Sequence, residues 1–320
     1  MVRRWLARPA AAALGLLLDR AFGEPPARLH PVSWFGQAML LAERADYRDS
    51  RAAGAVHALI GVAAGAGAGA LLGSAALGTG LAVAGRSLGE SALTVGQALD
   101  RGDLAAARAA LPALVGRDPA GLDEAEIARA VVESVAENTV DAVVAPAFWA
   151  AVCGAPGALG YRAVNTLDAM VGHRSTRYHA YGWASARLDD AANYLPARLT
   201  AALVAAVRPG SAADIWRAVR GQAPAHPSPN AGVAEAAFAA ALGLRLGGCN
   251  RYGDRVEHRP WLGQGRPAAR SDIGPAVRLS SDVSWLLTAG LATAGLAGRR
   301  CAPGTGRNAP SRRNERQINE

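Results

Sequence analysis

The chain has 320 residues and a formal net charge of +8, and 51% of its residues are hydrophobic while only 19% are charged, whereas soluble domains carry about a quarter charged residues. The deficit comes from Ala, Gly, Leu and Val concentrated in a few runs, which predicts membrane segments separated by polar loops. The absence of lysine excludes a Schiff-base lysine and a Walker-type phosphate-binding lysine, and three cysteines without CxxC spacing argue against a disulfide framework or a zinc site.

The first apolar segment covers residues 5–18, behind two arginines and without a convincing cleavage motif. It is shorter than the ~20 residues of an ordinary span, so we expect a short, retained membrane segment or an interfacial helix. A turn with two consecutive prolines follows and carries Asp19, Glu24, His30 and Pro31. We expect its His30–Pro31 end to help complete a functional site.

The second apolar run, residues 54–85, has no charge between His57 and Arg86. It is longer than one upright span, so the helix is expected to tilt or break. Its repeated small residues, as in GVAAGAGAGALLGSAALGTG, let helix backbones approach closely in lipid. The glycine-rich part lacks a preceding strand and helix-start chemistry, which excludes a nucleotide-binding loop.

The polar stretch from residue 86 to 141 has a largely helical pattern. Within it, Asp123 is a predicted N-cap, because Glu124 and Glu126 stand in the first turn of the helix that follows.

An acidic stripe ends this stretch. Glu133, Glu137 and Asp141 stand at i, i+4 and i+8, so they share one helix face, with Asn138 beside them. Such like charges repel by a few tenths of a kcal/mol per pair, which is tolerable if the face binds a cation such as Mg²⁺ or arginines from elsewhere. A solvated acidic face is the alternative, but the stripe runs directly into an apolar segment, which favours a functional site.

Three further apolar segments are expected at residues 142–159, 196–207 and 283–296. The first of them contains two prolines and two glycines, which neighbouring helices in a bundle tolerate. Together the segments predict an all-α fold: a multi-pass integral membrane helical bundle in the cell membrane, with about four to five spans and polar helical loops.

The polar block from residue 161 to 198 is unusually dense in Asn, Asp, Arg, His and Tyr for a segment between membrane runs. Asn165 and Asp168 form an i, i+3 pair, and Asp189 and Asn193 an i, i+4 pair. Five arginines accompany them: Arg162, Arg174, Arg177, Arg187 and Arg198. Asp and Asn supply hard oxygen ligands for Mg²⁺, and arginine binds phosphate or carboxylate. The block therefore predicts a site for an anionic ligand with a metal, and the alternative is a salt-bridged interfacial loop.

A third polar group, AHPSPNAGVAEAAF, contains His226, Ser228, Asn230 and Glu235 around two prolines. We expect Asn230 to cap the helix that follows. A capped helix start is the simpler interpretation of this group, since a single histidine such as His226 is more often structural than a catalytic base.

The last residues, 299–320, are rich in Arg, Pro, Gly and Asn and are expected to form a disordered, cytoplasmic tail. Residues 1–298 are then one integral membrane catalytic domain. Because no folded face interleaves basic with aromatic residues, no nucleic-acid partner is expected.

These stretches, taken in order, resemble the adenosylcobinamide-phosphate synthase family of cobalamin biosynthesis (CobD/CbiB). The resemblance rests on ESVAEN, NTLDAMVG, DDAANYLPARL and HPSPNAG, and it runs from about residue 14 to 285. It implies a membrane enzyme that forms an amide between adenosylcobyric acid and (R)-1-aminopropan-2-ol or its phosphate. It also implies ATP and Mg²⁺ as cofactors and, as further partners, the lipid bilayer and other membrane enzymes of the late cobalamin pathway.

The resemblance implies roles for individual side chains. Catalytic roles fall to Glu137, Asn138, Asp168, Asp189, Asp190 and His226, where a carboxylate or His226 takes the proton from the attacking amine. Substrate and phosphate contacts fall to Asn165, Arg174, Arg177, Arg187, Asn193, Arg198 and Asn230. The expected Mg²⁺ ligands are Asp141, Asp189 and Asp190.

The chain departs from the family pattern at Ala142, where a glycine is expected, and at His173 and Ser175, where an aromatic residue and an asparagine are usual. Two alternatives stay open. One is a non-catalytic membrane sensor of the related β-lactamase-induction family, and the other is a transporter with a broken helix near residues 154–160. The intact NTLD and DDxANY blocks, which a pure scaffold does not need, favour the enzyme.

Overall fold

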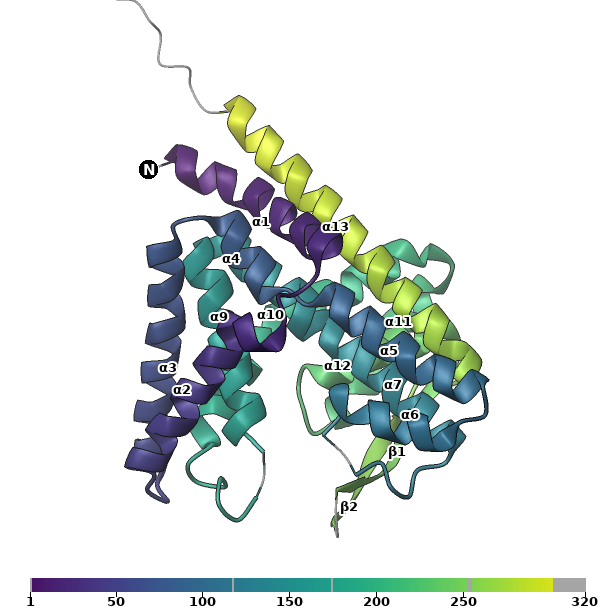
Figure 1. Ribbon diagram of the computed structural model, residues 1–320. Helices are drawn as coiled ribbons and strands as arrows, with labels where there is room; N and C mark the ends of the chain where they lie inside the picture. Colours follow the sequence, from purple (N-terminus) through teal and green to yellow (C-terminus); the bar gives the residue numbers. More distant parts are fainter. Residues whose placement is uncertain (1, 117, 174, 253–254, 302–320) are drawn as a thin grey trace, which may run out of the picture.

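The computed structural model describes residues 2–116, 118–173, 175–252 and 255–301. It is 78% helical, which confirms the helical class expected from the sequence (Figure 1). The helices are α1 (Val2–Phe22), α2 (Pro31–Asp46), α3 (Arg51–Leu72), α4 (Ala75–Ala82), α5 (Gly85–Asp100), α6 (Leu104–Ala110), α7 (Glu124–Thr139), α8 (Ala145–Cys153), α9 (Ala155–Val171), α10 (Trp183–Val207), α11 (Ala212–Gly221), α12 (Ala231–Leu242) and α13 (Ile273–Cys301). The predicted tail falls almost wholly outside the described residues.

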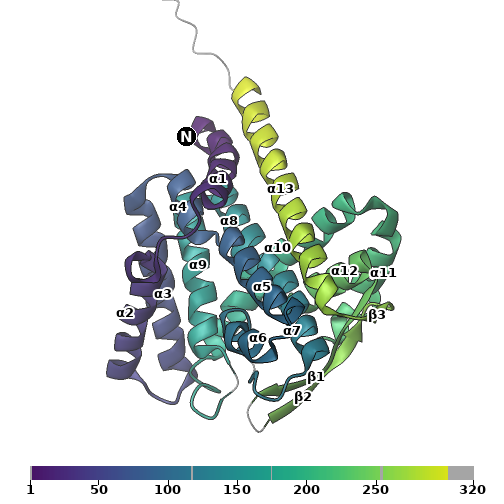
Figure 2. The same ribbon diagram turned by 45° about the vertical axis from the view of Figure 1, so that its right-hand side comes forward.

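The first and last helices, α1 and α13, pack side by side although they come from opposite ends of the chain (Figures 1 and 2). Their contact is close because small residues meet in it. A Cβ atom added to Gly295 would lie 2.5 Å from the Cβ of Ala10. The apolar segments expected at residues 5–18 and 283–296 therefore form one helix pair.

The long apolar run breaks into two helices, as its length predicted. Helix α3 ends at Gly73 in the left-handed conformation (φ 67°), and the Ser74 side chain accepts the hydrogen bond that starts α4. Helix α3 packs along α9, and its small residues allow the approach, since a Cβ on Gly69 would lie 2.4 Å from the carbonyl oxygen of Ala155. This packing fixes α9, which carries part of the polar block.

Helix α7 begins where its cap was predicted. The Asp123 side chain accepts from the backbone N–H of Glu126, whose own side chain accepts from the backbone N–H of Asp123. At its end the chain makes one π-helical turn, Val140–Val144, before α8. Such turns are rare and recur at functional sites. Gly154 (φ 71°) then separates α8 from α9, so the segment expected at residues 142–159 is not one continuous helix.

A small three-stranded sheet, which the sequence analysis did not predict, lies at the edge of the bundle. Its central strand β1 (Leu244–Tyr252) pairs antiparallel with β2 (Arg255–Leu262) and parallel with the short β3 (Arg266–Pro267). The sheet is held to α7, because the guanidinium of Arg129 on that helix donates to the carbonyl oxygens of Gly247 and Cys249 on β1.

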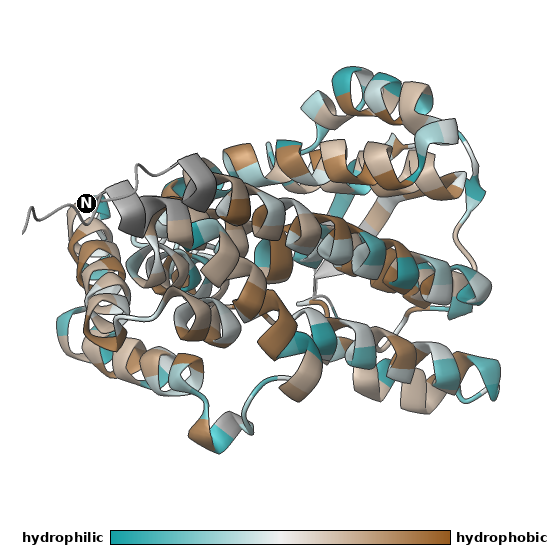
Figure 3. Cartoon of the chain, turned by 90° about the horizontal axis from the view of Figure 1, so that it is seen from above, coloured by the Kyte–Doolittle hydropathy of each residue, from teal (hydrophilic) through white to brown (hydrophobic). Residues whose placement is uncertain are grey.

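Among the described residues, one helix, α3, is both long and apolar enough to cross a membrane. Only 28% of its most apolar window is buried, and Leu59 and Leu71 on it are 68% and 91% exposed. Figure 3 shows hydrophobic residues along the outside of the helices as well as between them. The number of spans, expected to be four to five, stays a prediction.

An ion pair between a buried aspartate and a half-exposed arginine fixes the start of α13. Both carboxylate oxygens of Asp272 accept from Arg266 at 2.7 Å, and Oδ2 also accepts from the N–H of Ala269 at 2.8 Å. Burial alone would raise the pKa of Asp272, but these hydrogen bonds and the arginine charge outweigh it and lower the pKa. The pair thus favours the folded state whenever Asp272 is ionised.

We therefore expect Asp272→Asn to lower the free energy of unfolding by about 2 kcal/mol at neutral pH. Because the folded-state pKa is lowered, the contribution is complete above the ordinary value of about 3.8 and is lost as the pH falls through the lowered one. Denaturant unfolding in detergent at neutral pH and at about pH 3 measures this. A difference between the two proteins that is equally large at both pH values would contradict the expectation.

Candidate functional site

Three helical segments bring five polar side chains together inside the bundle. Asp141 lies on the π-helical turn, Tyr161 and Asn165 lie one turn apart on α9, and Asp189 and Asn193 lie one turn apart on α10. The i, i+4 spacing turns both members of each pair to the same side of their helix. We call these five residues the acid–amide ring.

Hydrogen bonds close the ring. The Asn165 Nδ2 lies 3.3 Å from Asp141 Oδ2 and 3.4 Å from Asp189 Oδ1 and donates to both. The Asn193 Nδ2 donates to Asp189 Oδ2 at 3.0 Å. The Tyr161 hydroxyl donates to Asn193 Oδ1 at 2.8 Å and lies 3.4 Å from Asp141 Oδ1. Both carboxylates therefore meet polar partners on two sides, which fixes their orientation.

Carboxylates outnumber cations around the ring. Burial first, and then the charges of Asp189, Glu137 and Asp168, raise the pKa of Asp141 well above its ordinary value. Burial, helped by neighbouring carboxylates, raises the pKa of Asp168 to about 7. Burial also raises the pKa of Asp189 to about 6, although the ring amides lower it. A bound cation would relieve this repulsion.

The residues of the predicted acidic stripe lie in two different environments. Glu133 is 2% exposed, accepts from the N–H of Gly247 at 2.8 Å and lies 3.4 Å from Arg129. Glu137 lies between it and the ring and lines a small cavity of about 110 Å³ together with Arg259. The solvated-face interpretation is therefore wrong, because the stripe runs through the interior.

The donor atoms of the ring suit Mg²⁺, which prefers oxygen ligands. Within the described part of the chain, however, no three Asp, Glu, His or Cys side chains converge closely enough to form a ready-made metal cage. Mg²⁺ in proteins keeps several waters and is held by one or two carboxylates together with substrate phosphates. Asp141 and Asp189, which share the Asn165 amide, fit that kind of site.

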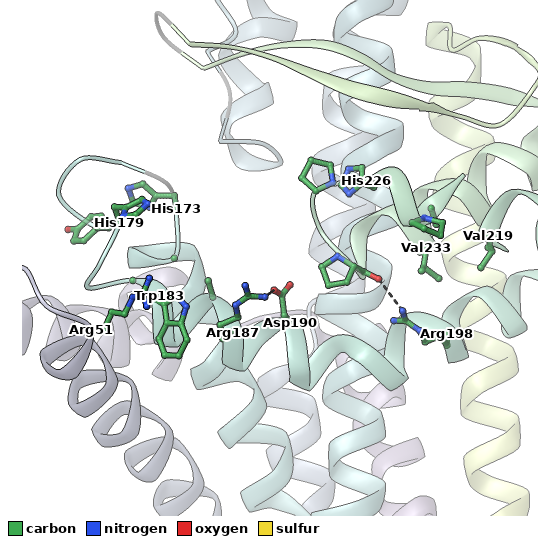
Figure 4. A pocket seen from close by; sticks show the side chains of 18 residues that line it. Arg51, His173, His179, Trp183, Arg187, Asp190, Arg198, Val219, His226 and Val233 are labelled. Atoms are coloured by element: carbon green, nitrogen blue, oxygen red, sulfur yellow. Dashed lines mark hydrogen bonds and ion pairs between the residues drawn. The ribbon is translucent and has the colours of Figure 1, made fainter. Parts of the chain in front are cut away.

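Beside the ring lies a cavity with a volume of about 820 Å³. Its walls come from the loop between α9 and α10, from the first half of α10 and from the 223–233 segment (Figure 4). Its charged and imidazole lining includes Arg51, His173, His179, Arg187, Asp190, Arg198 and His226. With three arginines and one carboxylate, the cavity favours anions.

The cavity and the ring are joined through two neighbouring residues. Consecutive positions on a helix point about 100° apart, so Asp189 faces the ring while Asp190 faces the cavity. Arg187 Nη1 lies 3.8 Å from Asp190 Oδ2, and its side chain is 69% exposed. Most of the Arg187 side chain is thus available to a ligand in this cavity.

Arg198 and Asn230 hold the opposite wall. Arg198 Nη1 donates to Asn230 Oδ1 at 2.9 Å, and Nη2 donates to the carbonyl oxygen of Pro229 at 3.3 Å. The Asn230 amide donates to the carbonyl oxygen of Asp190 at 2.7 Å. The predicted Asn230 cap is wrong, because its side chain makes no cap hydrogen bond to α12, and Ser228 Oγ accepts from the N–H of Ala231 instead.

His226 lines the cavity, but its side chain is only 2% exposed. Its Nδ1 lies 3.1 Å from the backbone nitrogen of Ser228, and its Nε2 lies 3.7 Å from Glu235 Oε1. Burial lowers the pKa of His226. Both ring nitrogens thus face protein groups, an arrangement that orders the HPSPN turn.

Other predicted site residues lie elsewhere. The Arg177 guanidinium binds Glu43 at 2.8 Å, and Asn138 donates back to Ser134 on its own helix. His30 starts α2 and lies 3.3 Å from Glu24. None of these three lines the cavity, and Arg174 lies outside the described residues.

Sequence reasoning missed several residues that the fold brings to the site. Arg51 reaches the cavity from the start of α3 and stacks 5.3 Å from the Trp183 ring. Tyr161 closes the ring, and Glu43 anchors the loop that bears His179. Arg51 and Glu43 stand more than a hundred residues before the polar block, so only long-range contacts reveal them. Tyr161 stands four residues before Asn165, a spacing that could have drawn attention to it.

Known proteins resemble this chain over most of its length. A family profile described as CobD/Cbib protein matches residues 12–280. This chain belongs to the CobD/CbiB family. The Cobalamin biosynthesis protein CobD of Mycobacterium tuberculosis (strain CDC 1551 / Oshkosh) is 49% identical over 293 residues, which cover 86% of this chain and 92% of the relative. The CobD of Chromobacterium violaceum is 46% identical, covering 86% and 93% of the two chains. The CobD of Geobacter metallireducens is 41% identical, covering 86% and 89%.

Membership in the CobD/CbiB family confirms the resemblance drawn from the motifs and assigns the chain to cobalamin biosynthesis. No solved structure matches it. The profile spans the acid–amide ring and all of the cavity's lining residues, which run from Arg51 to Val233.

Proposed function

We propose that this CobD/CbiB protein is a membrane-bound ligase that joins adenosylcobyric acid to (R)-1-aminopropan-2-ol or its phosphate through an amide, with ATP and Mg²⁺. The observation that carries the proposal is the junction at Asp189 and Asp190. There a carboxylate cluster rich in oxygen donors meets an arginine-lined cavity of about 820 Å³. This pairing suits a metal-bound phosphate on one side and an anionic substrate on the other.

Each half of the junction has its own task in the proposed reaction. Asp141 and Asp189, oriented by the ring amides, would hold Mg²⁺ with its nucleotide. ATP supplies the free energy for amide formation by activating the carboxylate that accepts the amine. Arg187, assisted by Arg198 and Arg51, binds anionic groups in the cavity and stabilises negative charge that develops there.

The attacking amine must lose a proton before or during amide formation. Of the two kinds of acceptor that we expect, a carboxylate and His226, the Asp190 carboxylate faces the cavity, whereas the His226 ring is 2% exposed with both nitrogens against protein groups. We therefore assign the proton acceptor role to Asp190 in preference to His226.

We further propose that the protein is a multi-pass protein of the cell membrane. Helix α3 supports this, since it is long, apolar and mostly unburied. Exposed aliphatic and aromatic side chains also lie on the neighbouring helices, among them Trp34 and Leu41 on α2 and Leu77 on α4. Water would not favour such a surface, whereas lipid would.

Complementation tests the proposed reaction. A cobalamin auxotroph blocked at this step, supplied with cobyric acid and aminopropanol phosphate, is expected to grow when it expresses this chain. Growth should fail with Asp189→Asn expressed to the same level in the membrane. Absence of growth with the unaltered chain, despite confirmed membrane expression, would overturn the ligase and favour a non-catalytic sensor.

A further inference from the structure

One buried carboxylate outside the ring has three hydrogen bonds with the loop that forms a wall of the cavity. Glu43 lies on α2 and is 3% exposed. Its Oε1 accepts from Arg177 Nε at 3.2 Å, from Arg177 Nη2 at 2.8 Å and from the Tyr178 hydroxyl at 3.0 Å. Both partners belong to the α9–α10 loop, whose described part is residues 172–173 and 175–182.

Further contacts fasten the same loop to the end of α2 and to α3. The Tyr47 hydroxyl donates to the carbonyl oxygen of Arg177 at 2.7 Å, and the Arg177 guanidinium lies 4.0 Å from the centre of the Tyr47 ring. Tyr181 is 1% exposed, and its ring packs 5.2 Å from that of Tyr47. At Gly54 an added Cβ would clash with the carbonyl group of Tyr181, so the loop lies flush on α3.

The loop that Glu43 binds also borders the cavity. His173, Tyr178 and His179 are among its lining residues, and Figure 4 shows His173 and His179 together on this loop, across the cavity from His226. The Tyr178 ring meets the His173 ring edge to face at 4.9 Å. A continuous series of contacts therefore runs from Glu43 through Tyr178 to His173 in the cavity wall.

We propose that Glu43 is a positioning residue, which holds the α9–α10 loop so that His173 and His179 face an anionic ligand in the cavity. The ligand is the substrate phosphate or carboxylate of the proposed function, on which this inference rests. A loop that is already ordered loses less conformational entropy when the ligand binds, so the contacts of Glu43 contribute to affinity rather than to the chemical step. Arg177, which we expected to bind phosphate, instead helps to hold the loop through its hydrogen bonds to Glu43.

The test compares Glu43→Gln with the unaltered full chain in detergent. Asp272→Asn is the matched control, because it also neutralises a buried, arginine-bound carboxylate but lies outside the cavity lining. Cleavage by trypsin within residues 172–182 is mapped by mass spectrometry while inorganic phosphate is titrated. The KM and kcat for aminopropanol phosphate are measured in parallel.

We expect trypsin to cleave the loop of Glu43→Gln faster than that of the unaltered chain. The phosphate concentration that protects half of the variant from cleavage should be about tenfold higher. The KM should rise by about tenfold, while kcat changes by less than about twofold. Asp272→Asn should match the unaltered chain in cleavage rate, phosphate protection, KM and kcat. If Glu43→Gln does not accumulate in the membrane, Tyr178→Phe removes only the hydroxyl bound to Glu43 and should shift the same readouts in the same direction.

The outcomes separate this inference from the proposed function. Unchanged phosphate protection and KM in Glu43→Gln, in a chain that makes the amide, overturn the inference alone. The inference is also overturned if Glu43→Gln changes only the stability of the protein, which is the result expected for Asp272→Asn. A chain that makes no amide, but whose phosphate protection weakens in Glu43→Gln, overturns the reaction and supports the positioning role. Absence of phosphate protection in the unaltered chain overturns the inference.

Discussion

Asp189→Asn is expected to lower kcat by about a thousandfold while the protein still folds and inserts. The Asp189 carboxylate accepts from both Asn165 and Asn193. An amide at this position replaces one acceptor oxygen by an NH₂ donor, which then faces another donor. Asn193 cannot simply rotate its amide, because its Oδ1 already accepts from Tyr161. The substitution therefore removes a charge and disrupts the ring.

The measurement is amide formation from purified components at saturating substrates, with Mg²⁺ titrated. Asp214→Asn is the control, since that carboxylate is 62% exposed in a surface ion pair and should leave kcat unchanged. We expect the Mg²⁺ concentration for half-maximal rate to rise in Asp189→Asn. A kcat within about tenfold of the unaltered chain, with unaltered Mg²⁺ dependence, would remove Asp189 from the catalytic site.

Arg187→Ala is expected to raise the KM for the anionic substrate by about 10- to 100-fold with little change in kcat, because charge-assisted hydrogen bonds are worth about 1.5–3 kcal/mol. Its side chain is 69% exposed and approaches only Asp190 at 3.8 Å among the ion pairs described. Arg198, by contrast, already donates to Asn230, Pro229 and Tyr194. Loss of Arg187 therefore removes ligand contacts without removing a structural anchor.

Arg217→Ala is a matched control, since Arg217 forms another i, i+3 pair with an aspartate and is 66% exposed but lies outside the cavity lining. Its KM should stay unchanged. Salt screens an exposed charge, so rising ionic strength should raise the KM of the unaltered chain more than that of Arg187→Ala. Equal KM values for Arg187→Ala and Arg217→Ala would show that no anionic group approaches this arginine.

The helical class, the family and the start of α7 followed from the sequence, because they depend on local patterns. The Asp123 cap and the break in the long apolar run at Gly73–Ser74 are decided by neighbouring residues. The i, i+4 spacing on α10 likewise indicated that Asp189 and Asn193 share a face, and the ring contains them both. The small sheet escaped notice, since β1 and β2 are held by α7 and by each other.

The apolar segments and the density of polar residues from Glu133 to Arg198 were determined by the sequence alone, because composition and spacing are properties of the chain itself. Only the tertiary structure decided which of those polar residues act together. It turned Asp189 and Asp190 to different sides, brought Arg51 to the cavity and bound Arg177 to Glu43. Residues far apart in the chain meet only through helix packing, and the direction of each side chain depends on the helix that carries it.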